Sequence, residues 1–301
     1  MPISALRTPD TRFVDLPGFA FTARYIENLQ GFESLRMHYL DEPAQSKVSG
    51  RTFLCLHGQP TWSYLYRRMI PIFTAAGHRV VAPDFFGFGR SDKPTDETVY
   101  TFDFHRESLR QFILAMDLKN VVMVCQDWGG VLGLTLPMDM PERFDALFIM
   151  DTLIGTGAPP PQSFLDWRTY SNRTPDMDVG KLLKRGCPHI SDAEAAAYNA
   201  PFPDTTYKAG VRRFPNLVPV TPEDPGAAVS RRAAAWLKEQ WTGRSFVAIG
   251  LKDPVLSPES MRQLAAGIRN CPTPLEVSEA GHFVQEWGAE VAREGLKVLG
   301  L

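Results

Sequence analysis

Short apolar runs alternate along the chain with segments whose apolar residues recur at helical spacing. The runs cover residues 53–56, 79–82, 121–125, 147–150, 246–249 and 275–277. Most of them are too short and too uniformly apolar for amphipathic surface helices, and they are typical of parallel strands buried on both faces. Between residues 104 and 117 the apolar positions follow a helical repeat instead. This alternation predicts an α/β fold with a mostly parallel, doubly wound sheet.

The stretch between about residues 155 and 225 interrupts this alternation. It opens with a turn-rich, proline-containing linker and continues with helix-like segments, such as 179–185 and 191–198. In the second of these, Ser191 and Glu194 have the spacing of a capping box at a helix N-terminus. No convincing strand pattern is present, so we expect a mostly helical insertion between two strands of the main sheet.

This organisation predicts two structural units. Residues 1–154 and 226–301 are expected to form the core domain, and residues 155–225 are expected to form a helical cap. Open α/β sheets bind ligands at the carboxyl ends of their strands. An insertion that leaves and re-enters the sheet at that edge would therefore cover the binding site.

Composition and charge favour an ordinary globular protein, with 44% hydrophobic residues, 22% charged residues and a formal net charge of −2. The balanced charge gives no electrostatic reason to expect nucleic acid or an anionic membrane as a partner. Three arginine pairs, at 67–68, 212–213 and 231–232, are short and scattered, and we expect them on a solvated surface. No run approaches the roughly 20 apolar residues of a membrane-spanning helix. The polar residues 1–13 lack the pattern of a secretory signal, so we expect a cytoplasmic protein, with a monomer as the default.

The cysteines indicate neither a disulfide framework nor a metal site. Cys55, Cys125, Cys187 and Cys271 form no C-x-x-C pair and have no metal-like spacing. We expect four free thiols in a reducing compartment. No ligand cluster or phosphate-binding loop predicts a metal or an organic cofactor.

The most informative motif is the segment 121–130, where a strand-like run leads through a turn into a helix. Asp127 occupies the turn, and the small residues Cys125 and Gly129 lie two positions before and after it. This is the spacing of a nucleophile elbow, in which small neighbours let the strand and the helix approach closely. An aspartate that merely caps a helix would also explain the position, but three further segments favour a nucleophile.

These three segments would complete a catalytic site. Gln59 lies in a loop after an earlier strand, and its backbone N–H could form an oxyanion hole together with that of Trp128. Asp253 follows a later strand, and His282 lies in a loop after the last strand. The chain order of nucleophile, acid and histidine is the order expected of α/β-hydrolases.

Together these segments resemble those of haloalkane dehalogenases. The resemblance rests on residues 57–60, 86–94, 125–130, 200–204 and 281–286 in this order, and it covers nearly the whole chain. It is closest to the branch whose catalytic acid follows the strand after the cap. It implies an α/β-hydrolase fold with a helical cap, and an enzyme that converts haloalkanes to a primary alcohol, halide and a proton.

The resemblance implies a covalent mechanism, and the chemistry explains why the nucleophile is an aspartate. A serine attacking an sp³ carbon would leave an ether, whereas Asp127 would leave an ester that water can cleave. His282 would deprotonate that water, and Asp253 would orient His282. The backbone N–H groups of Trp128 and Gln59 would stabilise the oxyanion that forms on the ester.

The resemblance also nominates residues for the halide and the substrate. Indole N–H groups suit a departing halide, because each is a donor on an apolar ring. Trp128 would be one donor and Trp167, in the cap, the second, although packing between cap and core would also explain Trp167. Phe164 would line a pocket for a small apolar halogenated substrate.

Two residues depart from the pattern of this branch. Gln59 stands where the branch typically has a glutamate that helps to hold the catalytic water. Glutamine keeps an acceptor but loses the charge. We expect a competent enzyme, and the sequence leaves open whether this change weakens the hydrolytic step. Asp151 stands where the branch usually has asparagine and where other branches place their catalytic acid. It is therefore an alternative to Asp253, which we favour.

Other functions are compatible with parts of this pattern. An epoxide hydrolase would use the same Asp–His–Asp triad, but it needs proton donors, usually two cap tyrosines, and Tyr170, Tyr198 and Tyr207 are available. A fluoroacetate dehalogenase would have an arginine where Trp128 stands. A catalytically silent binding protein on the same fold would be a third alternative, but such proteins usually lose a triad member, and this chain retains all three.

Overall fold

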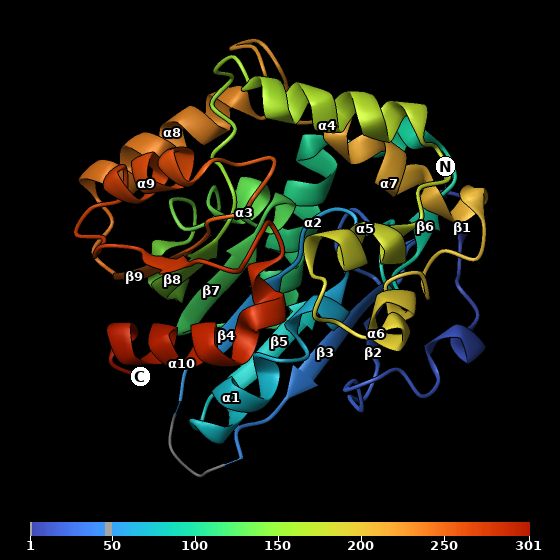
Figure 1. The fold of residues 1–301 in the computed structure, drawn as a ribbon, viewed down its shortest axis with the longest axis horizontal. Coiled ribbons are helices and arrows are strands. Elements are labelled where there is room, and N and C mark those ends of the chain that lie inside the picture. Colours follow the sequence, from blue (N-terminus) through green and yellow to red (C-terminus); the bar gives the residue numbers. More distant parts are fainter. Residues whose placement is uncertain (1, 46–49) are drawn as a thin grey trace.

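The computed structural model describes residues 2–45 and 50–301, and one sheet of eight strands runs through it. The strand order is β10-β9-β8-β7-β4-β5-β3-β2 (Figure 1). Strand β3 pairs antiparallel with both of its neighbours, and every other pair in the sheet is parallel. The bounds are Arg24–Ile26 (β2), Met37–Glu42 (β3), Thr52–Leu56 (β4), Arg79–Pro83 (β5), Val121–Gln126 (β7), Phe144–Met150 (β8), Arg244–Gly250 (β9) and Leu275–Val277 (β10). The mostly parallel sheet predicted from the sequence is confirmed.

Helices cover both faces of this sheet. The helices outside the 155–225 segment are α1 (Ile70–Ala75), α2 (Phe102–Ala115), α3 (Trp128–Gly133), α8 (Ala227–Glu239), α9 (Pro258–Ala266) and α10 (Gly288–Leu299). Alternate residues of β7 belong to two separate apolar cores: Val121 and Met123 to one, Val122 and Val124 to the other. The first core includes residues of α2, α8 and α9, and the second includes residues of α1 and α10. Because both faces are covered, the middle positions of the central strands are apolar, which explains the continuous runs in the sequence.

Helix α2 shows how local sequence sets an element boundary. It spans Phe102–Ala115, whereas the apolar repeat predicts 104–117. The helix begins earlier because the Thr101 side chain accepts a hydrogen bond from the Phe104 N–H at 3.1 Å and caps its first turn. Its apolar stripe, which includes Leu109 and Phe112, is buried against the sheet as the spacing predicts.

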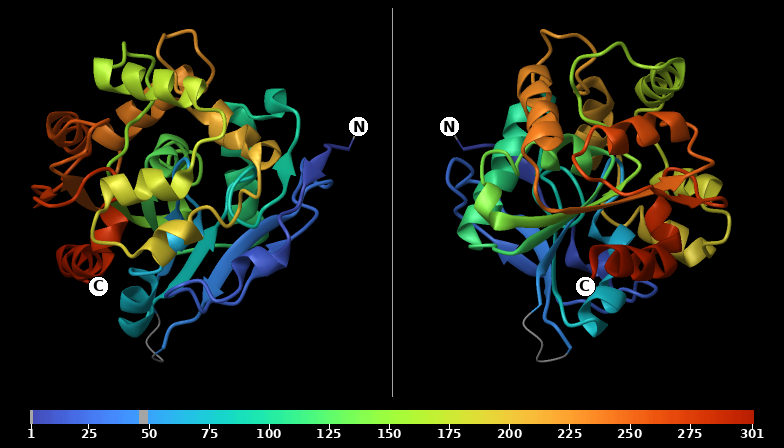
Figure 2. Two further views of the ribbon diagram at one scale, coloured as in Figure 1. Left: turned by 45° about the vertical axis from the view of Figure 1, so that its right-hand side comes forward. Right: turned by 90° about the vertical axis from the view of Figure 1, so that its left-hand side faces the viewer.

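The segment between β8 and β9 contains only helical elements and loops over residues 155–225, all of which are described. Its elements are α4 (Gln162–Arg173), α5 (Val179–Gly186), α6 (Asp192–Ala197), η5 (Thr205–Lys208), α7 (Ala209–Arg213) and η6 (Phe214–Asn216). The capping box of Ser191 and Glu194 is present at the start of α6. Helix α4 lies at the upper end of the molecule in every view, away from α1 and α10 at the lower end (Figure 2).

The remaining elements are short. Strands β1 (Ala5–Leu6) and β6 (Lys93–Pro94) form a separate antiparallel pair. The other 3₁₀ helices are η1 (Asp10–Phe13), η2 (Ser63–Tyr66), η3 (Glu97–Val99), η4 (Pro141–Arg143) and η7 (Val284–Trp287). No helix in the described ranges is both long enough and apolar enough to cross a bilayer. The four cysteines are free thiols, as the sequence predicts.

Candidate active site

Asp127 lies on a sharp turn between β7 and α3, at the carboxyl edge of the sheet. Its backbone has φ 49° and ψ −125°, a conformation that a residue with a side chain adopts only under strain. A Cβ atom at Gly129 would lie 2.0 Å from the Leu56 carbonyl oxygen, so only glycine lets the helix approach β4 this closely. The Asp127 side chain is 23% exposed. The turn therefore presents a carboxylate rather than burying it as a helix cap.

The loop after β4 supplies a donor to this carboxylate. The Gln59 backbone N–H donates to Asp127 Oδ1 at 2.7 Å. His57 holds the loop in place: Phe85 N–H donates to its Nε2 at 3.0 Å, so its proton is on Nδ1, which donates to the Gly58 carbonyl at 2.9 Å. Among the described residues, the Trp128 backbone N–H makes no hydrogen bond to the Asp127 side chain. One of the two expected oxyanion donors is thus in contact with the carboxylate, and the other is its immediate chain neighbour.

His282 lies between two carboxylates. Its Nδ1 is 2.7 Å from Asp253 Oδ2, and its Nε2 is 3.5 Å from Asp127 Oδ2. Asp253 is fully buried, and its Oδ1 accepts the backbone N–H groups of Val255 at 2.7 Å and Leu256 at 3.0 Å. These bonds hold the Asp253 carboxylate with one oxygen towards the ring.

The charges around His282 favour its protonated form. Burial by itself lowers the pKa of His282, but the Asp253 and Asp127 carboxylates raise it, and the net shift is well above the usual value. The two carboxylates therefore favour a ring with a proton on each nitrogen in the resting protein. Any change that neutralises Asp127 removes part of this effect and lowers the pKa of His282.

Two further side chains hold the elbow, and the sequence analysis did not single them out. Gln126 Nε2 donates to the His282 backbone carbonyl at 3.0 Å, which ties the histidine loop to the end of β7. Thr152 Oγ1 donates to the Asp127 backbone carbonyl at 2.6 Å. Gln126 could have been found from the sequence, because it is a polar residue at the end of an otherwise apolar strand run.

A cavity of about 720 Å³ opens onto Asp127 and His282. Its wall near these residues is mostly apolar and includes Trp128, Val131 and Leu153 from the core. The segment 155–225 completes the wall with Phe164, Trp167, Leu182, Pro215 and Val218. Charged side chains, among them Arg185, Lys252 and Glu279, also line the cavity. The arrangement suits an apolar molecule held with one end at the carboxylate.

The expected halide and pocket residues share this cavity. Trp128 and Phe164 are buried, Trp167 is half-buried, and all three line the cavity. The Trp128 ring packs edge-on against Phe214, with 4.8 Å between ring centroids. None of the described residues accepts a hydrogen bond from the indole of Trp128 or Trp167. Both donors are therefore free to serve a ligand.

The Gln59 side chain is directed towards the segment 155–225. Its Nε2 donates to the Val211 backbone carbonyl in α7 at 2.9 Å. A carboxylate oxygen at this place would face another acceptor. The amide therefore fits its surroundings, and its carbonyl oxygen is the group left to contact a molecule in the cavity.

Asp151 lies beside the triad but does not contact the histidine ring. Its carboxyl group accepts the Gly250 N–H at 3.1 and 3.2 Å and is fully buried. His282 instead pairs with Asp253. The geometry gives Asp253, and not Asp151, direct contact with the ring.

The tyrosines that an epoxide hydrolase would need are not at the cavity. Within the described residues, the cavity wall contains no tyrosine. Tyr198 is buried elsewhere and bonds to Glu286 and Arg67, and Tyr170 is exposed on α4. Nor do three or more His, Cys, Asp or Glu side chains in residues 2–45 and 50–301 gather in the way that a metal ion needs.

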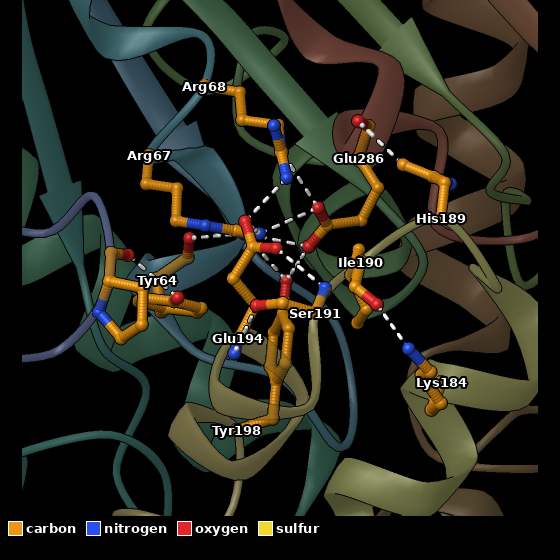
Figure 3. A network of polar contacts seen from close by, with 11 residues as sticks. Tyr64, Arg67, Arg68, Lys184, His189, Ile190, Ser191, Glu194, Tyr198 and Glu286 are labelled. Carbon is orange, nitrogen blue, oxygen red and sulfur yellow. Dashed lines mark hydrogen bonds and ion pairs between the residues drawn. The ribbon is translucent and has the colours of Figure 1, made fainter.

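The expectation of a solvated Arg67–Arg68 pair is wrong. Arg67 is buried and donates to both oxygens of Glu286, at 2.7 and 2.8 Å, and to Glu194 at 2.9 Å (Figure 3). Arg68 bonds to the same two glutamates. Two adjacent arginines in the sequence do not reveal that glutamates from two other elements lie beside them in the fold.

Comparison with protein families finds a match to the α/β-hydrolase fold over residues 51–289. Among curated proteins, the haloalkane dehalogenase of Psychrobacter cryohalolentis is 42% identical over 96% of this chain and 95% of its own length. Haloalkane dehalogenase 1 of Mycobacterium tuberculosis is 39% identical over 98% of both chains.

Solved structures give the same result. The haloalkane dehalogenase DpaA from Paraglaciecola agarilytica NO2 is 51% identical and superimposes with a TM-score of 0.95 over 98% of both chains. Likeness of this extent includes the elbow, the loop after β4, the segment 155–225 and the histidine loop.

Proposed function

This chain belongs to the haloalkane dehalogenase family within the α/β-hydrolase fold and hydrolyses carbon–halogen bonds, and we propose that Asp127 is its nucleophile. The observation that carries this assignment is the strained carboxylate at the elbow, with one oxygen held by the Gln59 N–H and the other beside His282. The remaining steps follow from the atoms that surround these two oxygens.

The first step is an in-line displacement. Asp127 Oδ2 attacks the carbon that carries the halogen, the carbon–halogen bond breaks, and its electron pair leaves with the halide. Oδ1, which already accepts the Gln59 N–H, becomes the carbonyl oxygen of the ester. The indole N–H groups of Trp128 and Trp167 receive the halide, because both are free donors on the wall of the same cavity. Quenching of tryptophan fluorescence by bromide tests this pair: it should weaken in Trp167→Phe and persist in Trp236→Phe, which lies outside the cavity.

The second step needs His282 as a base, and the first step produces that base. Ester formation removes the negative charge of Asp127, which is one of the causes that raise the pKa of His282, so His282 releases its Nε2 proton to solvent. His282 then accepts a proton from water at Nε2, and the water oxygen attacks the carbonyl carbon of the ester. The oxyanion on Oδ1 is stabilised by the Gln59 N–H and, in this intermediate, by the Trp128 N–H. When the intermediate collapses, the bond to the alkyl oxygen breaks and the proton of the added hydroxyl passes to that oxygen, so the alcohol leaves and the Asp127 carboxylate is restored. His282 keeps the proton that it took from water.

The segment 155–225 acts as a cap domain on a core of residues 1–154 and 226–301. The support for this division is that the cap supplies one side of the cavity wall, including Phe164 and Trp167, and the core supplies the reacting groups. Phe164 and its apolar neighbours exclude water from the carboxylate and accept a small halogenated alkane. The absence of tyrosines from the described cavity wall favours this substrate over an epoxide.

The test is His282→Phe incubated with a bromoalkane. The ester should form and persist, so mass spectrometry should find one alkyl group on the peptide that contains Asp127. Asp127→Asn in the same background is the control and should carry no adduct. Bromide release without any adduct would contradict a covalent intermediate.

The assembly and the location of the enzyme are separate questions. The relative DpaA is described as tetrameric, which favours an oligomer over the monomer expected from the sequence alone. Light scattering on the purified protein decides between the two masses. The four free thiols support a reducing compartment such as the cytoplasm, and fractionation of the host cell tests this.

A further inference from the structure

Two buried carboxyl groups lie side by side behind His282. Asp151 directly follows strand β8, and Asp253 follows strand β9. Both side chains are fully buried. Gly250 joins the two residues, because its N–H donates to the Asp151 carboxyl group at 3.1 and 3.2 Å and its carbonyl accepts the Asp253 N–H at 3.2 Å. Two ionised carboxylates placed together in a buried site repel each other strongly, which favours a proton on one of them.

The donors around the two groups differ, and they identify which group is ionised. Asp253 accepts three hydrogen bonds, from His282 Nδ1 at 2.7 Å and from the backbone N–H groups of Val255 and Leu256. Asp151 accepts one N–H, that of Gly250, shared between its two oxygens at 3.1 and 3.2 Å. Hydrogen bonds to the ionised form favour ionisation, and Asp253 receives more of them than Asp151 does.

We infer that Asp151 is a neutral carboxylic acid that donates a hydrogen bond to Asp253 and thereby serves as a positioning residue for the hydrolytic step. This role rests on the function proposed above, because its effect passes through Asp253 to His282. Asp151 is thus not a second triad acid. It is a fourth member of the catalytic group and lies behind Asp253.

The surroundings of Asp151 agree with a neutral group. Burial raises the pKa of Asp151, and the charge of Asp253 raises it further, which together outweigh the opposing effects of His282 and the Gly250 N–H. Asp127, the other acid beside His282, brings no positive charge that would favour ionisation of Asp151. Lys252, in the loop with Asp253, pairs instead with Glu279 on the surface.

Glycine at position 250 makes this arrangement possible. A Cβ atom there would lie 2.8 Å from Asp151 Oδ2 and 2.2 Å from the Gly281 carbonyl oxygen. The bare backbone lets its N–H reach the Asp151 carboxyl group and lets the histidine loop pass close by. The contact between Gly250 and Asp151 therefore joins β9 to the end of β8, next to the loop that carries His282.

A neutral Asp151 has a consequence for the pH dependence of the reaction. While it is protonated, it adds a donor to Asp253 and no charge near His282. When it loses its proton at alkaline pH, a second negative charge raises the pKa of His282 and keeps the ring from acting as a base. The decay of the alkyl-enzyme should therefore slow at alkaline pH, through the titration of a residue that does not touch the substrate.

The first test is infrared spectroscopy of the resting protein at neutral pH. The wild type should show the carbonyl band of a protonated carboxylic acid, and Asp151→Asn should lack it. Asp145→Asn, at the other end of β8, is the matched control and should retain the band. Absence of the band from the wild type would overturn the inference. This measurement requires no turnover, so its result is independent of whether the proposed reaction takes place.

The second test follows the decay of the alkyl-enzyme against pH. Asp151→Ala should slow the decay by about tenfold to a hundredfold, the effect of removing a hydrogen bond to a charged group. Asp151→Asn should restore most of this loss, because its amide can still donate to Asp253, and it should lack the alkaline decline. If Asp151→Asn instead moves the acid limb of the profile to lower pH, Asp151 was ionised beside His282 and the inference is wrong.

Discussion

Two groups of buried charged side chains meet along the stretch from His282 to η7, and they differ in how their charges are matched. The first contains His282 with Asp127, Asp253 and, behind them, Asp151. The second joins Arg67 and Arg68 of the core to Glu194 of α6 and Glu286 of η7 (Figure 3). Both connect segments that are far apart in the sequence.

The second group is balanced. It contains two arginines and two glutamates, and Glu286, which is fully buried, accepts bonds from both arginines and from the Tyr198 hydroxyl. Burial raises the pKa of Glu194, but the Ser191 N–H and Arg67 lower it to a net value of about 2. Glu194 therefore keeps its charge far below neutral pH. A cluster of this kind fixes α6 against the core and leaves no group free to react.

The catalytic group has more carboxyl groups than cations. One imidazole faces Asp253 and Asp127, and Asp127 Oδ2 retains access to the cavity. The comparison teaches that burial of charge by itself does not mark an active site. An active site is marked instead by an acid whose charge is not fully matched by partners and whose exposed oxygen adjoins an apolar cavity.

The largest expected effect comes from breaking the catalytic group at Asp253. Asp253→Asn should lower kcat by about 10⁴-fold, because the histidine loses both its orientation and the stabilisation of its cation. Single-turnover kinetics should show that the alkyl-enzyme forms and then persists. Asp151→Asn should cost far less, and the reverse order would assign the triad acid to Asp151.

Breaking the balanced group should affect stability rather than chemistry. Glu286→Gln leaves Arg67 buried with an incomplete partner, and we expect a loss of about 3–5 kcal/mol in the free energy of unfolding. Denaturant titration measures this loss. The exposed residue Glu290 provides the control, and Glu290→Gln should change stability by less than about 0.5 kcal/mol.

The rate of alkyl-enzyme formation separates the two groups. At a temperature where Glu286→Gln remains folded, this rate should stay within a few-fold of the wild type. A variant that folds normally yet fails to form the ester would show that Glu286 belongs to the catalytic machinery, and the distinction between the clusters would be lost.

The smallest expected effect concerns Gln59. Gln59→Glu adds a charged acceptor for the catalytic water, and the decay of the alkyl-enzyme should accelerate by roughly fivefold. The same change removes the bond to the Val211 carbonyl, which limits the gain. Pre-steady-state kinetics measures the accumulated ester, and an unchanged amount would show that Gln59 does not weaken the hydrolytic step.

The central strands and the elbow could be predicted because their physics is local. The central strands are buried on both faces, so the middle of each appears in the sequence as an apolar run. These strands are β4, β5, β7, β8 and β9. The elbow requires small neighbours, which are visible at Cys125 and Gly129. The chain order of Asp127, Asp253 and His282 then located the triad.

The edge of the sheet could not be predicted in the same way. Strand β3 contains His38, Asp41 and Glu42. Asp41 and Glu42 are only partly buried, whereas His38 is fully buried and its Nδ1 lies 2.6 Å from Asp84 Oδ2. Strand β2 has only three residues. Patterns this short and this mixed do not differ from those of loops.

Contacts between distant segments also could not be predicted from the sequence. The Arg67 cluster depends on a glutamate from α6 and another from η7, and neither is near Arg67 in the chain. The pairing of Asp151 with Asp253 is a similar case, because two acids after neighbouring strands appear in the sequence as alternatives for one role. We infer that the two acids have different roles, so both can serve at once.

The central claim is that the Asp127 carboxylate forms an ester which water opens at its own carbonyl carbon. A single turnover in ¹⁸O-labelled water with excess enzyme and 1-bromobutane tests it directly. The account predicts that the heavy isotope enters the peptide containing Asp127 and that the alcohol released carries ordinary oxygen. Label found in the alcohol, with none in Asp127, would show direct attack of water on the substrate and would contradict the account.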